Sequence, residues 1–281
     1  MTAAAFARKF SVTLLFQVKQ SFSTWRVRGI FILVGVFIWM NAQPVGDFAA
    51  SVGLGVRPWL FGHFVNDFVC QLIFTAACVA LFADAPWDTA MSLYILPRSG
   101  KLAQCAGHVL YVAVMALLFT LFIFFVSVAA VLPVLEFGEG WGKALGTLAR
   151  TNASSQFAMT FAVNDFLIGA YTPVQATLRS FFLEWACFTW LGLTIYLLNR
   201  NISRTTGTFA AVVFVLLDIT VANELSKTVY HFSPITLAQV TSLVGLNAHY
   251  GITLRYAVLF FGCGIAALIL VNLIMARRRL K

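Results

Sequence analysis

Three acidic residues stand inside apolar stretches of the chain and are the first candidates for chemistry. Asp67, Glu184 and Asp218 are each surrounded in sequence by aliphatic and aromatic residues. A carboxylate in an apolar environment is costly, and is usually retained for a task such as contacting a substrate or gating a pathway. We therefore assign these three residues to a candidate substrate pathway. The alternative is that they cap helix ends, face water or pair with nearby arginines, of which the sequence offers Arg57, Arg179 and Arg255.

Local motifs for catalysis, metal binding or nucleotide binding are not found in the sequence. There is no HExxH, GxSxG or glycine-rich dinucleotide turn, the four histidines are isolated, and the five cysteines form no CxxC pair. The stretch FGEGWGKAL resembles the end of a phosphate-binding loop, but Phe137 stands where that loop needs glycine and Ala144 where it needs a hydroxyl. We therefore predict no catalytic residue, no metal site, no ATP site and no cofactor in this chain. A membrane-embedded, lipid-modifying enzyme assembled from distant residues is the alternative.

A polar segment, Ala83–Leu102, interrupts two strongly apolar runs. Asp84 and a following proline suit the start of a short helix. Met91 and Tyr94 then fall on one face, and Pro97 stops the helix. Such an amphipathic helix needs the membrane surface or a groove on a partner protein to cover its apolar face.

The composition indicates which elements must position these residues. The 281-residue chain is 60% hydrophobic and only 10% charged, with a mean hydropathy of +0.88, whereas soluble domains carry about 25% charged residues. It is therefore predicted to be an all-α polytopic membrane protein. Since a spanning helix needs about 20 apolar residues, we predict six transmembrane helices, at about 28–44, 59–83, 103–134, 177–198, 207–225 and 253–276. Residues 28–281 would form a single domain.

Three further segments are predicted outside the spans. Residues 1–27 have an apolar stripe at four-residue spacing with basic residues mostly elsewhere, which predicts an amphipathic helix lying on the membrane surface. Segments 135–176 and 223–252 contain apolar stretches too short or too polar to span the bilayer. Stretches of this kind usually form re-entrant or interfacial helices.

Basic residues give the orientation. With the N-terminus inside, thirteen of the nineteen Lys and Arg residues lie on the cytoplasmic side and six on the other. This bias predicts that both termini are cytoplasmic, in a multi-pass protein of the cell membrane, as in the bacterial inner membrane. Because the +9 net charge is spread in short clusters that flank apolar runs, it indicates membrane orientation and not nucleic-acid binding.

These features together resemble the type 2 permease family of ABC exporters. In that family an elbow helix precedes the first span, and a coupling segment lies between the second and third. The matching residues here are Asp84, the aliphatic and aromatic run Leu93–Leu96, and Pro97–Lys101. The family also tends to have a Ser-Pro motif in re-entrant helices before the last span, similar to His231–Val240.

The resemblance implies a permease without its own ATP site. A separate ABC ATPase on the cytoplasmic side would bind ATP and Mg, and a second permease chain would complete a homodimer or heterodimer in the lipid bilayer. The substrate would be an amphiphilic or hydrophobic compound such as a peptide antibiotic, a lipid or a drug. Within the coupling segment, 84–101, the resemblance assigns the ATPase contact to Asp84, Trp87, Met91, Tyr94, Arg98 and Lys101. A non-transporting sensor subunit that docks an ATPase is a further alternative.

Overall fold

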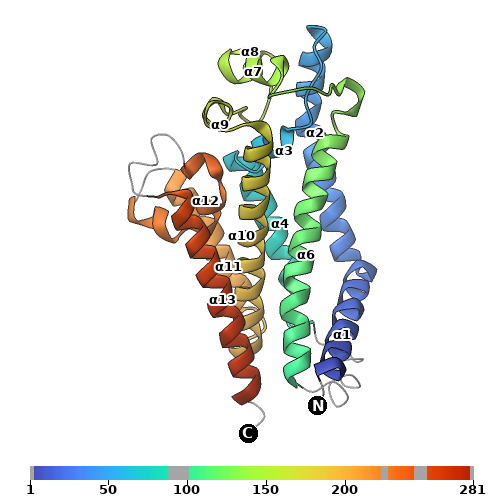
Figure 1. The fold of residues 1–281 in the computed structure, drawn as a ribbon, viewed down its shortest axis with the longest axis vertical. Helices are drawn as coiled ribbons and strands as arrows, with labels where there is room; N and C mark the ends of the chain where they lie inside the picture. Colours follow the sequence, from blue (N-terminus) through green and yellow to red (C-terminus); the bar gives the residue numbers. More distant parts are fainter. Residues whose placement is uncertain (1–2, 88–100, 223–226, 244–251, 279–281) are drawn as a thin grey trace.

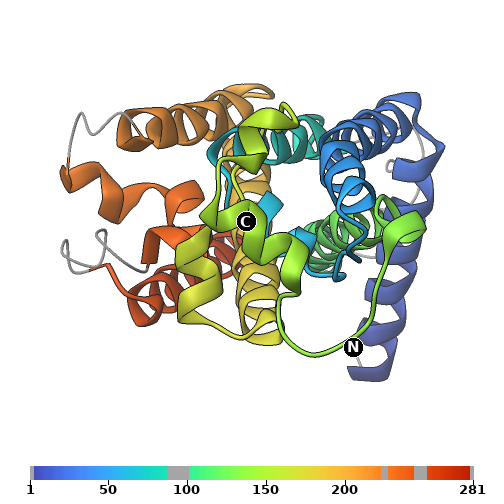
Figure 2. The same ribbon diagram turned by 90° about the horizontal axis from the view of Figure 1, so that it is seen from above.

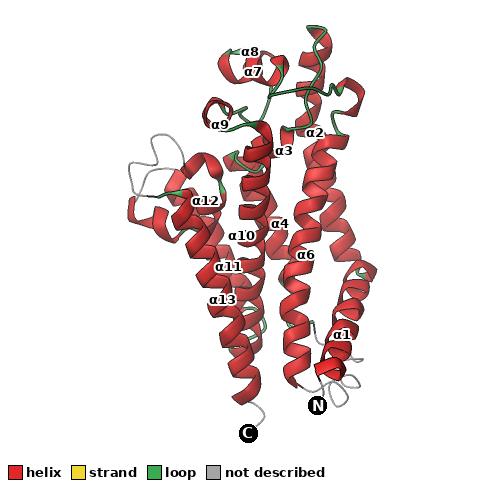
Figure 3. Ribbon diagram, viewed as in Figure 1, coloured by secondary structure: helices red, strands yellow, loops and turns green. Residues whose placement is uncertain are grey.

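The computed structural model describes residues 3–87, 101–222, 227–243 and 252–278. Within these residues the chain is helical and forms no β-strand beyond a single bridge between Val56 and Leu135 (Figure 3). The long helices run side by side along the long axis of the molecule, and both chain ends lie at the same end of this bundle (Figure 1). An all-α protein is therefore confirmed.

Four helices in the described residues are long and apolar enough to cross a membrane. They are α2 (Trp25–Ser51), α6 (Lys101–Ala129), α10 (Pro173–Asn201) and α13 (Leu254–Arg278). Their lengths of 25 to 29 residues exceed the roughly 20 residues that 30 Å of hydrocarbon requires.

Two more apolar helices are shorter. Helix α4 (Phe68–Phe82) has 15 residues and α11 (Thr206–Ala222) has 17. At 1.5 Å per residue they extend about 22 and 26 Å. All six stretches predicted from hydropathy thus contain a helix, and within the described residues four of these helices reach spanning length by themselves.

The first predicted span does not end at Pro44, because α2 continues to Ser51 with this proline inside it. A proline removes one backbone hydrogen bond. Ending the helix would instead leave four carbonyl groups without partners in an apolar environment. Continuation is therefore the less costly solution, and the sequence prediction was wrong by about two turns.

The second predicted span is interrupted near its start. The short helix α3 (Leu60–Phe64) ends before Asn66, and α4 begins after Asp67. Asn66 and Asp67 have short polar side chains that bond to nearby backbone groups and so compete with a continuous helix. A single helix over 59–83 was predicted, and the break is a correction to it.

The predicted third span is also too long. Helix α6 ends at Ala129, and a 3₁₀ turn, η1 (Leu132–Val134), follows it. Pro133 lies inside this turn, and a residue that precedes proline is disfavoured in the α conformation. The remaining spans differ from their predicted bounds by a few residues.

The amphipathic N-terminal segment forms α1 (Ala3–Ser23), which meets α2 at a break at Thr24. Seen from above, α1 extends along one edge of the molecule (Figure 2). It packs along α6, where Gln17 and His108 share a hydrogen bond of 3.1 Å and the hydroxyls of Ser21 and Tyr111 one of 2.5 Å. Part of its polar face is therefore used inside the protein.

Where the structure describes them, the two predicted outer segments form short helices. The first has α7 (Lys143–Arg150), α8 (Ala153–Gln156) and α9 (Asp165–Ala170), all at the end of the bundle opposite the termini (Figure 1). The second has η2 (Lys227–Phe232), α12 (Pro234–Ala238) and η3 (Val240–Leu243). Ser233 caps α12 and a proline begins it, so the Ser-Pro pair acts as a helix start. Helix α12 packs against α10 and α11.

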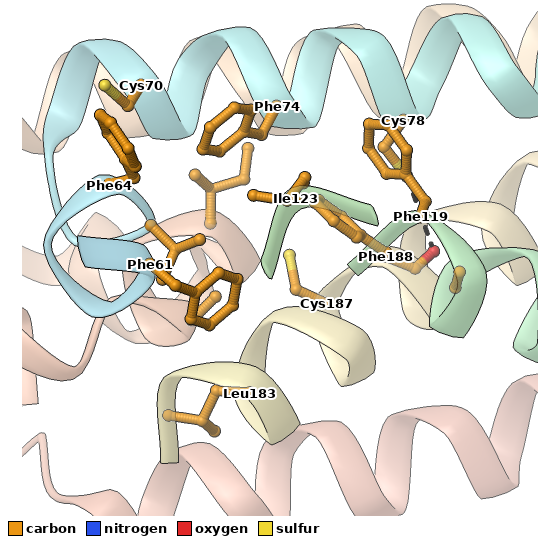
Figure 4. Packing of buried hydrophobic residues seen from close by; sticks show 14 of the residues in the cluster. Phe61, Phe64, Cys70, Phe74, Cys78, Phe119, Ile123, Leu183, Cys187 and Phe188 are labelled. Atoms are coloured by element: carbon orange, nitrogen blue, oxygen red, sulfur yellow. Dashed lines mark hydrogen bonds between the residues drawn. The ribbon is translucent and has the colours of Figure 1, made fainter. Parts of the chain in front are cut away.

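Aromatic and aliphatic side chains fill the centre of the bundle. Figure 4 shows this packing where α3, α4, α6 and α10 meet. Buried side chains from these helices include Phe61, Phe64, Phe74, Phe119, Ile123 and Phe188. The core therefore joins the helix before the polar segment 84–101 to the helix after it.

Candidate functional site

The base of the predicted coupling segment lies at the end of the bundle that carries both termini. The segment leaves α4 after Phe82 and re-enters the helical bundle as α6 at Lys101. Asp84 forms a salt bridge of 2.6 Å with Arg26 in the first turn of α2. The start of the segment is therefore tied to the junction of α1 and α2.

One asparagine side chain holds the same region to two further helices. The amide nitrogen of Asn199, near the end of α10, donates to the carbonyl oxygens of Ala83 at 3.3 Å and Ala85 at 3.1 Å. Its carbonyl oxygen accepts from the backbone N–H of Gly207, in the first turn of α11, at 2.7 Å. Asn199 thus connects the ends of α4 and α10 with the start of α11.

Trp87 lies at the centre of this base and points into the bundle. Its backbone has φ of +58°, a left-handed conformation that is unusual for an aromatic residue. The indole stacks on Tyr196 of α10 at a centroid distance of 5.7 Å, and meets Tyr111 of α6 edge-on at 4.7 Å. Such a backbone persists only where the surrounding packing holds it, and here two helices supply that packing.

Hydrogen bonds around His108 extend the cluster to α1. One ring nitrogen of His108 bonds to Gln17 at 3.1 Å, and the other bonds to the hydroxyl of Tyr196 at 3.3 Å. Arg200 donates to the same hydroxyl at 2.8 Å. We call Gln17, Trp87, His108, Tyr111 and Tyr196 the aromatic cluster. It joins the base of the coupling segment to α1, α6 and α10.

The structure describes half of the predicted coupling residues. Asp84 and Trp87 have the contacts given above, and Lys101 is the first residue of α6. Met91, Tyr94 and Arg98 lie outside the described residues, so their assignment to an ATPase contact stays a prediction.

A second polar region is buried inside the bundle, between α4, α10, α11 and α12. We call it the polar seam. Six of its members are polar residues with little or no exposed surface: Asn66, Gln71, Ser180, Glu184, Asp218 and Thr236. The seventh is Thr241, whose backbone N–H donates to Asn66.

Glu184 is the most deeply buried carboxyl group of the polar seam. Its side chain has no exposed surface, and Oε2 accepts from Nε2 of Gln71 on α4 at 2.8 Å. Its other oxygen, Oε1, and the side-chain oxygen of Gln71 have no hydrogen-bond partner. A pair of buried acceptors without donors is an arrangement that requires a proton, a ligand or a rearrangement to be satisfied.

Asp218 connects α11 to the Ser-Pro segment. The hydroxyl of Thr236 in α12 donates to Oδ1 of Asp218 at 2.6 Å, while Oδ2 has no partner. Asp218 therefore holds α12 against α11, with one carboxylate oxygen still unused.

Asn66 joins the break between α3 and α4 to two other segments. Its amide donates to Ser180 of α10 at 2.8 Å, and its carbonyl oxygen accepts from the backbone N–H of Thr241 in η3 at 3.0 Å. The polar seam therefore runs from the broken helix through α10 to the second outer segment.

Asp67 has a different position from the other two candidate pathway residues. Its Oδ1 accepts from the backbone N–H groups of Val69 and Cys70 at 3.0 and 3.1 Å, and Oδ2 from that of Ala162 at 3.2 Å. These are the contacts of a helix cap, which was the alternative interpretation of this residue. The structure brings Glu184 and Asp218 into one seam and gives Asp67 a capping role beside it.

Sequence reasoning missed the partners that complete both regions. Thr177, Ser180 and Glu184 recur on α10 at spacings of three and four, and Gln71 and Thr75 lie four residues apart on α4. This spacing places each set on one helix face, so two facing polar stripes were detectable. The pairing of His108 with Tyr196 had no comparable signal, because it joins residues 88 positions apart.

The aromatic cluster is held together by hydrogen bonds and ring contacts, and the polar seam by hydrogen bonds between buried side chains. Among the residues that the structure describes, no group of three or more His, Cys, Asp and Glu side chains could hold a metal ion. Comparison with protein-family models, with curated proteins and with solved structures finds no match to this chain.

Proposed function

We propose that this chain is the membrane-spanning permease subunit of an ATP-driven ABC transporter. A separate ATPase would bind the coupling segment, and the chain would export an amphiphilic or hydrophobic compound. We also propose six spans, with α3 and α4 together forming the second and α11 the fifth. Both termini would then be cytoplasmic, and a second permease chain would complete the transporter.

The observation that carries this proposal is the attachment of the coupling-segment base. A force applied to residues 84–101 would act through Trp87 on α6 and α10, and through Asp84 on the junction of α1 and α2. Through Asn199 it would also reach α11. A segment of this kind can bias a bundle between two arrangements, provided that a partner binds it differently in each.

The polar seam supports a pathway through α4, α10 and α11. Glu184 and Asp218 have unused acceptors inside α10 and α11, which we propose as spans, and ionisable residues within spans commonly mark substrate or ion pathways. The seam would open when α11 and α12 move relative to α10. A transported compound would then meet carboxyl groups that are covered in the present arrangement.

Gentle extraction of the native complex tests the proposal. The chain would be purified from its own membranes in mild detergent, and its associated proteins identified by mass spectrometry. The proposal predicts a co-purifying subunit with a phosphate-binding loop, retained by the wild type and lost from Tyr94→Asp. If no ATPase is retained by the wild type, the proposal fails.

A further inference from the structure

A polar cavity lies beside the base of the coupling segment, at the end of the bundle that carries both termini. It has a volume of about 210 Å³ and is lined by α1, the first turn of α2, the end of α4, Trp87, Tyr111 of α6 and the segment just before α11. Its polar lining includes Gln20, Ser21, Thr24, Arg26, Asp84 and Arg204. Cavities that hold drug-sized ligands measure roughly 300–1,000 Å³. This one therefore fits a small polar group better than a whole amphiphile.

Two polar atoms of the lining are buried without partners. They are Nε of Arg26, a donor, and Oε1 of Gln20, an acceptor. Arg26 uses Nη1 in the salt bridge to Asp84, so its Nε–H is still unsatisfied. A buried polar group without a partner is costly, and both side chains would gain partners by turning toward a ligand in the cavity that offers an acceptor and a donor.

The charge of the lining favours an anion. The lining contains two arginines, Arg26 and Arg204, and one acidic residue, Asp84, which pairs with Arg26. Guanidinium groups suit phosphate oxygens because their planar set of donors matches phosphate geometry. A phosphodiester with a hydroxyl-bearing end would therefore match the cavity in charge and in hydrogen bonding.

The position of the cavity indicates where such a group comes from. Trp25, next to the cavity, is 80% exposed, and the guanidinium of Arg28 lies 4.3 Å from its ring centroid. An exposed tryptophan with a basic neighbour at the end of a spanning helix is typical of the headgroup level of a membrane. On α1, Leu15 and Phe22 are exposed apolar side chains beside which acyl chains could lie.

We propose that this cavity binds the headgroup of an anionic phospholipid of the phosphatidylglycerol type. The phosphate would contact Arg26 and Arg204, and a glycerol hydroxyl would donate to Gln20. The lipid would come from the leaflet at the end of the bundle that carries both termini. The proposal requires a membrane but no ATPase, so it stands apart from the proposed transport function. A bound headgroup would connect α1 to Arg26 and Asp84, and so would brace the base of the coupling segment.

Native mass spectrometry of the delipidated full chain tests this site. Phosphatidylglycerol, phosphatidylethanolamine and phosphatidylcholine would be titrated separately, with inorganic phosphate as a fourth ligand. We expect phosphatidylglycerol to bind most tightly and phosphatidylcholine, which has no headgroup donor, least tightly. Arg204→Gln and Gln20→Leu should each weaken phosphatidylglycerol binding, by about tenfold for the arginine.

Matched controls keep the test specific. Lys19→Gln removes one positive charge from the exposed side of α1 without touching the cavity, and should leave binding unchanged. Arg26→Lys keeps the charge next to Asp84 but removes the planar donors, so it should weaken lipid binding even if the fold is intact. Equal binding of the three lipids, equal losses in Lys19→Gln and Arg204→Gln, or binding of inorganic phosphate with no lipid preference would overturn the proposal.

Discussion

At the scale of single residues, Trp87 is the side chain on which the account of coupling depends most. Its indole is packed between α6 and α10, and its backbone is in the left-handed region. A residue in this conformation stores strain that neighbouring contacts must offset. Loss of the ring therefore removes the contacts while the strain of the backbone persists.

Trp87→Ala should lower stability substantially. Truncation of a packed tryptophan typically costs about 3–5 kcal/mol, and we expect about 3 kcal/mol because Trp87 is only partly buried. Thermal unfolding in detergent, followed by intrinsic fluorescence or scattering, would measure the shift. Trp25→Ala, at a tryptophan that is 80% exposed, is the control and should be close to neutral. Similar losses in the two variants would contradict the packing role of Trp87.

Replacement of the Glu184 carboxyl group should lower transport while leaving the stability of the protein nearly unchanged. Glu184→Gln keeps the size of the side chain, and its amide can still pair with Gln71, so the fold should be retained within about 1 kcal/mol. Transport should fall, because the carboxyl group itself is lost from the polar seam. ATP-dependent flux in proteoliposomes is the measurement, and Asp47→Asn, at an exposed acid on α2, is the control. Full flux in Glu184→Gln would remove this residue from the pathway.

At the scale of elements, hydropathy predicted where helices occur but not how polar residues shape them. Every predicted apolar stretch contains a helix, since burial in an apolar medium requires backbone groups to be paired internally. The break at Asn66–Asp67 depends on side-chain bonds to nearby backbone groups and to Ser180 on α10. The continuation through Pro44 depends on the cost of unpaired carbonyls. Neither can be read from a window of hydropathy.

The roles of the candidate site residues also depend on contacts that hydropathy does not predict. The three acidic residues were identifiable because they interrupt apolar runs, but Asp67 proved to be a helix cap. Asp67 caps α4 through the backbone N–H groups of Val69 and Cys70, and its other oxygen accepts from that of Ala162 in the first predicted outer segment. Tertiary contacts of this kind leave no local pattern in the sequence.

The crossing of α10 and α11 depends on a single glycine. A Cβ atom at Gly207 would lie 2.4 Å from the carbonyl oxygen of Ile195 and 2.7 Å from its Cα. Gly207→Ala should therefore separate the two helices and destabilise the protein by about 1–3 kcal/mol. Gly262→Ala on α13, where nothing lies within 4 Å, should be neutral or slightly stabilising. Thermal unfolding of the two variants compares them directly, and an unaffected Gly207→Ala would contradict the close packing.

At the scale of the whole molecule, the two ends of the helical bundle carry different segments of the chain. One end carries both termini and the base of the coupling segment, and the other carries α7, α8 and α9 (Figure 1). This arrangement suits a device that receives a force on one side of a membrane and changes access on the other. It also defines a topology that can be tested without knowledge of the substrate.

Cysteine labelling in intact cells should report that topology. In a Cys263→Ser background, the four remaining cysteines are buried. Ser155→Cys, exposed on α8, should react with a membrane-impermeant maleimide from outside, whereas Ser203→Cys, exposed just before α11, should react only after permeabilisation. The reverse pattern would invert the proposed orientation.

The central claim is that ATP hydrolysis by a partner acts on this chain through residues 84–101. Its most direct test is a parallel measurement of ATP hydrolysis and flux in proteoliposomes in which each variant of the chain is reconstituted with the same amount of ATPase taken from the wild-type complex, with a fluorescent phospholipid analogue as the probe. Tyr94→Asp should abolish ATP-dependent flux while the permease itself stays folded. Phe137→Asp, which places the same acid at a 78% exposed position of the first outer segment, should transport normally. Unchanged flux in Tyr94→Asp would contradict the account.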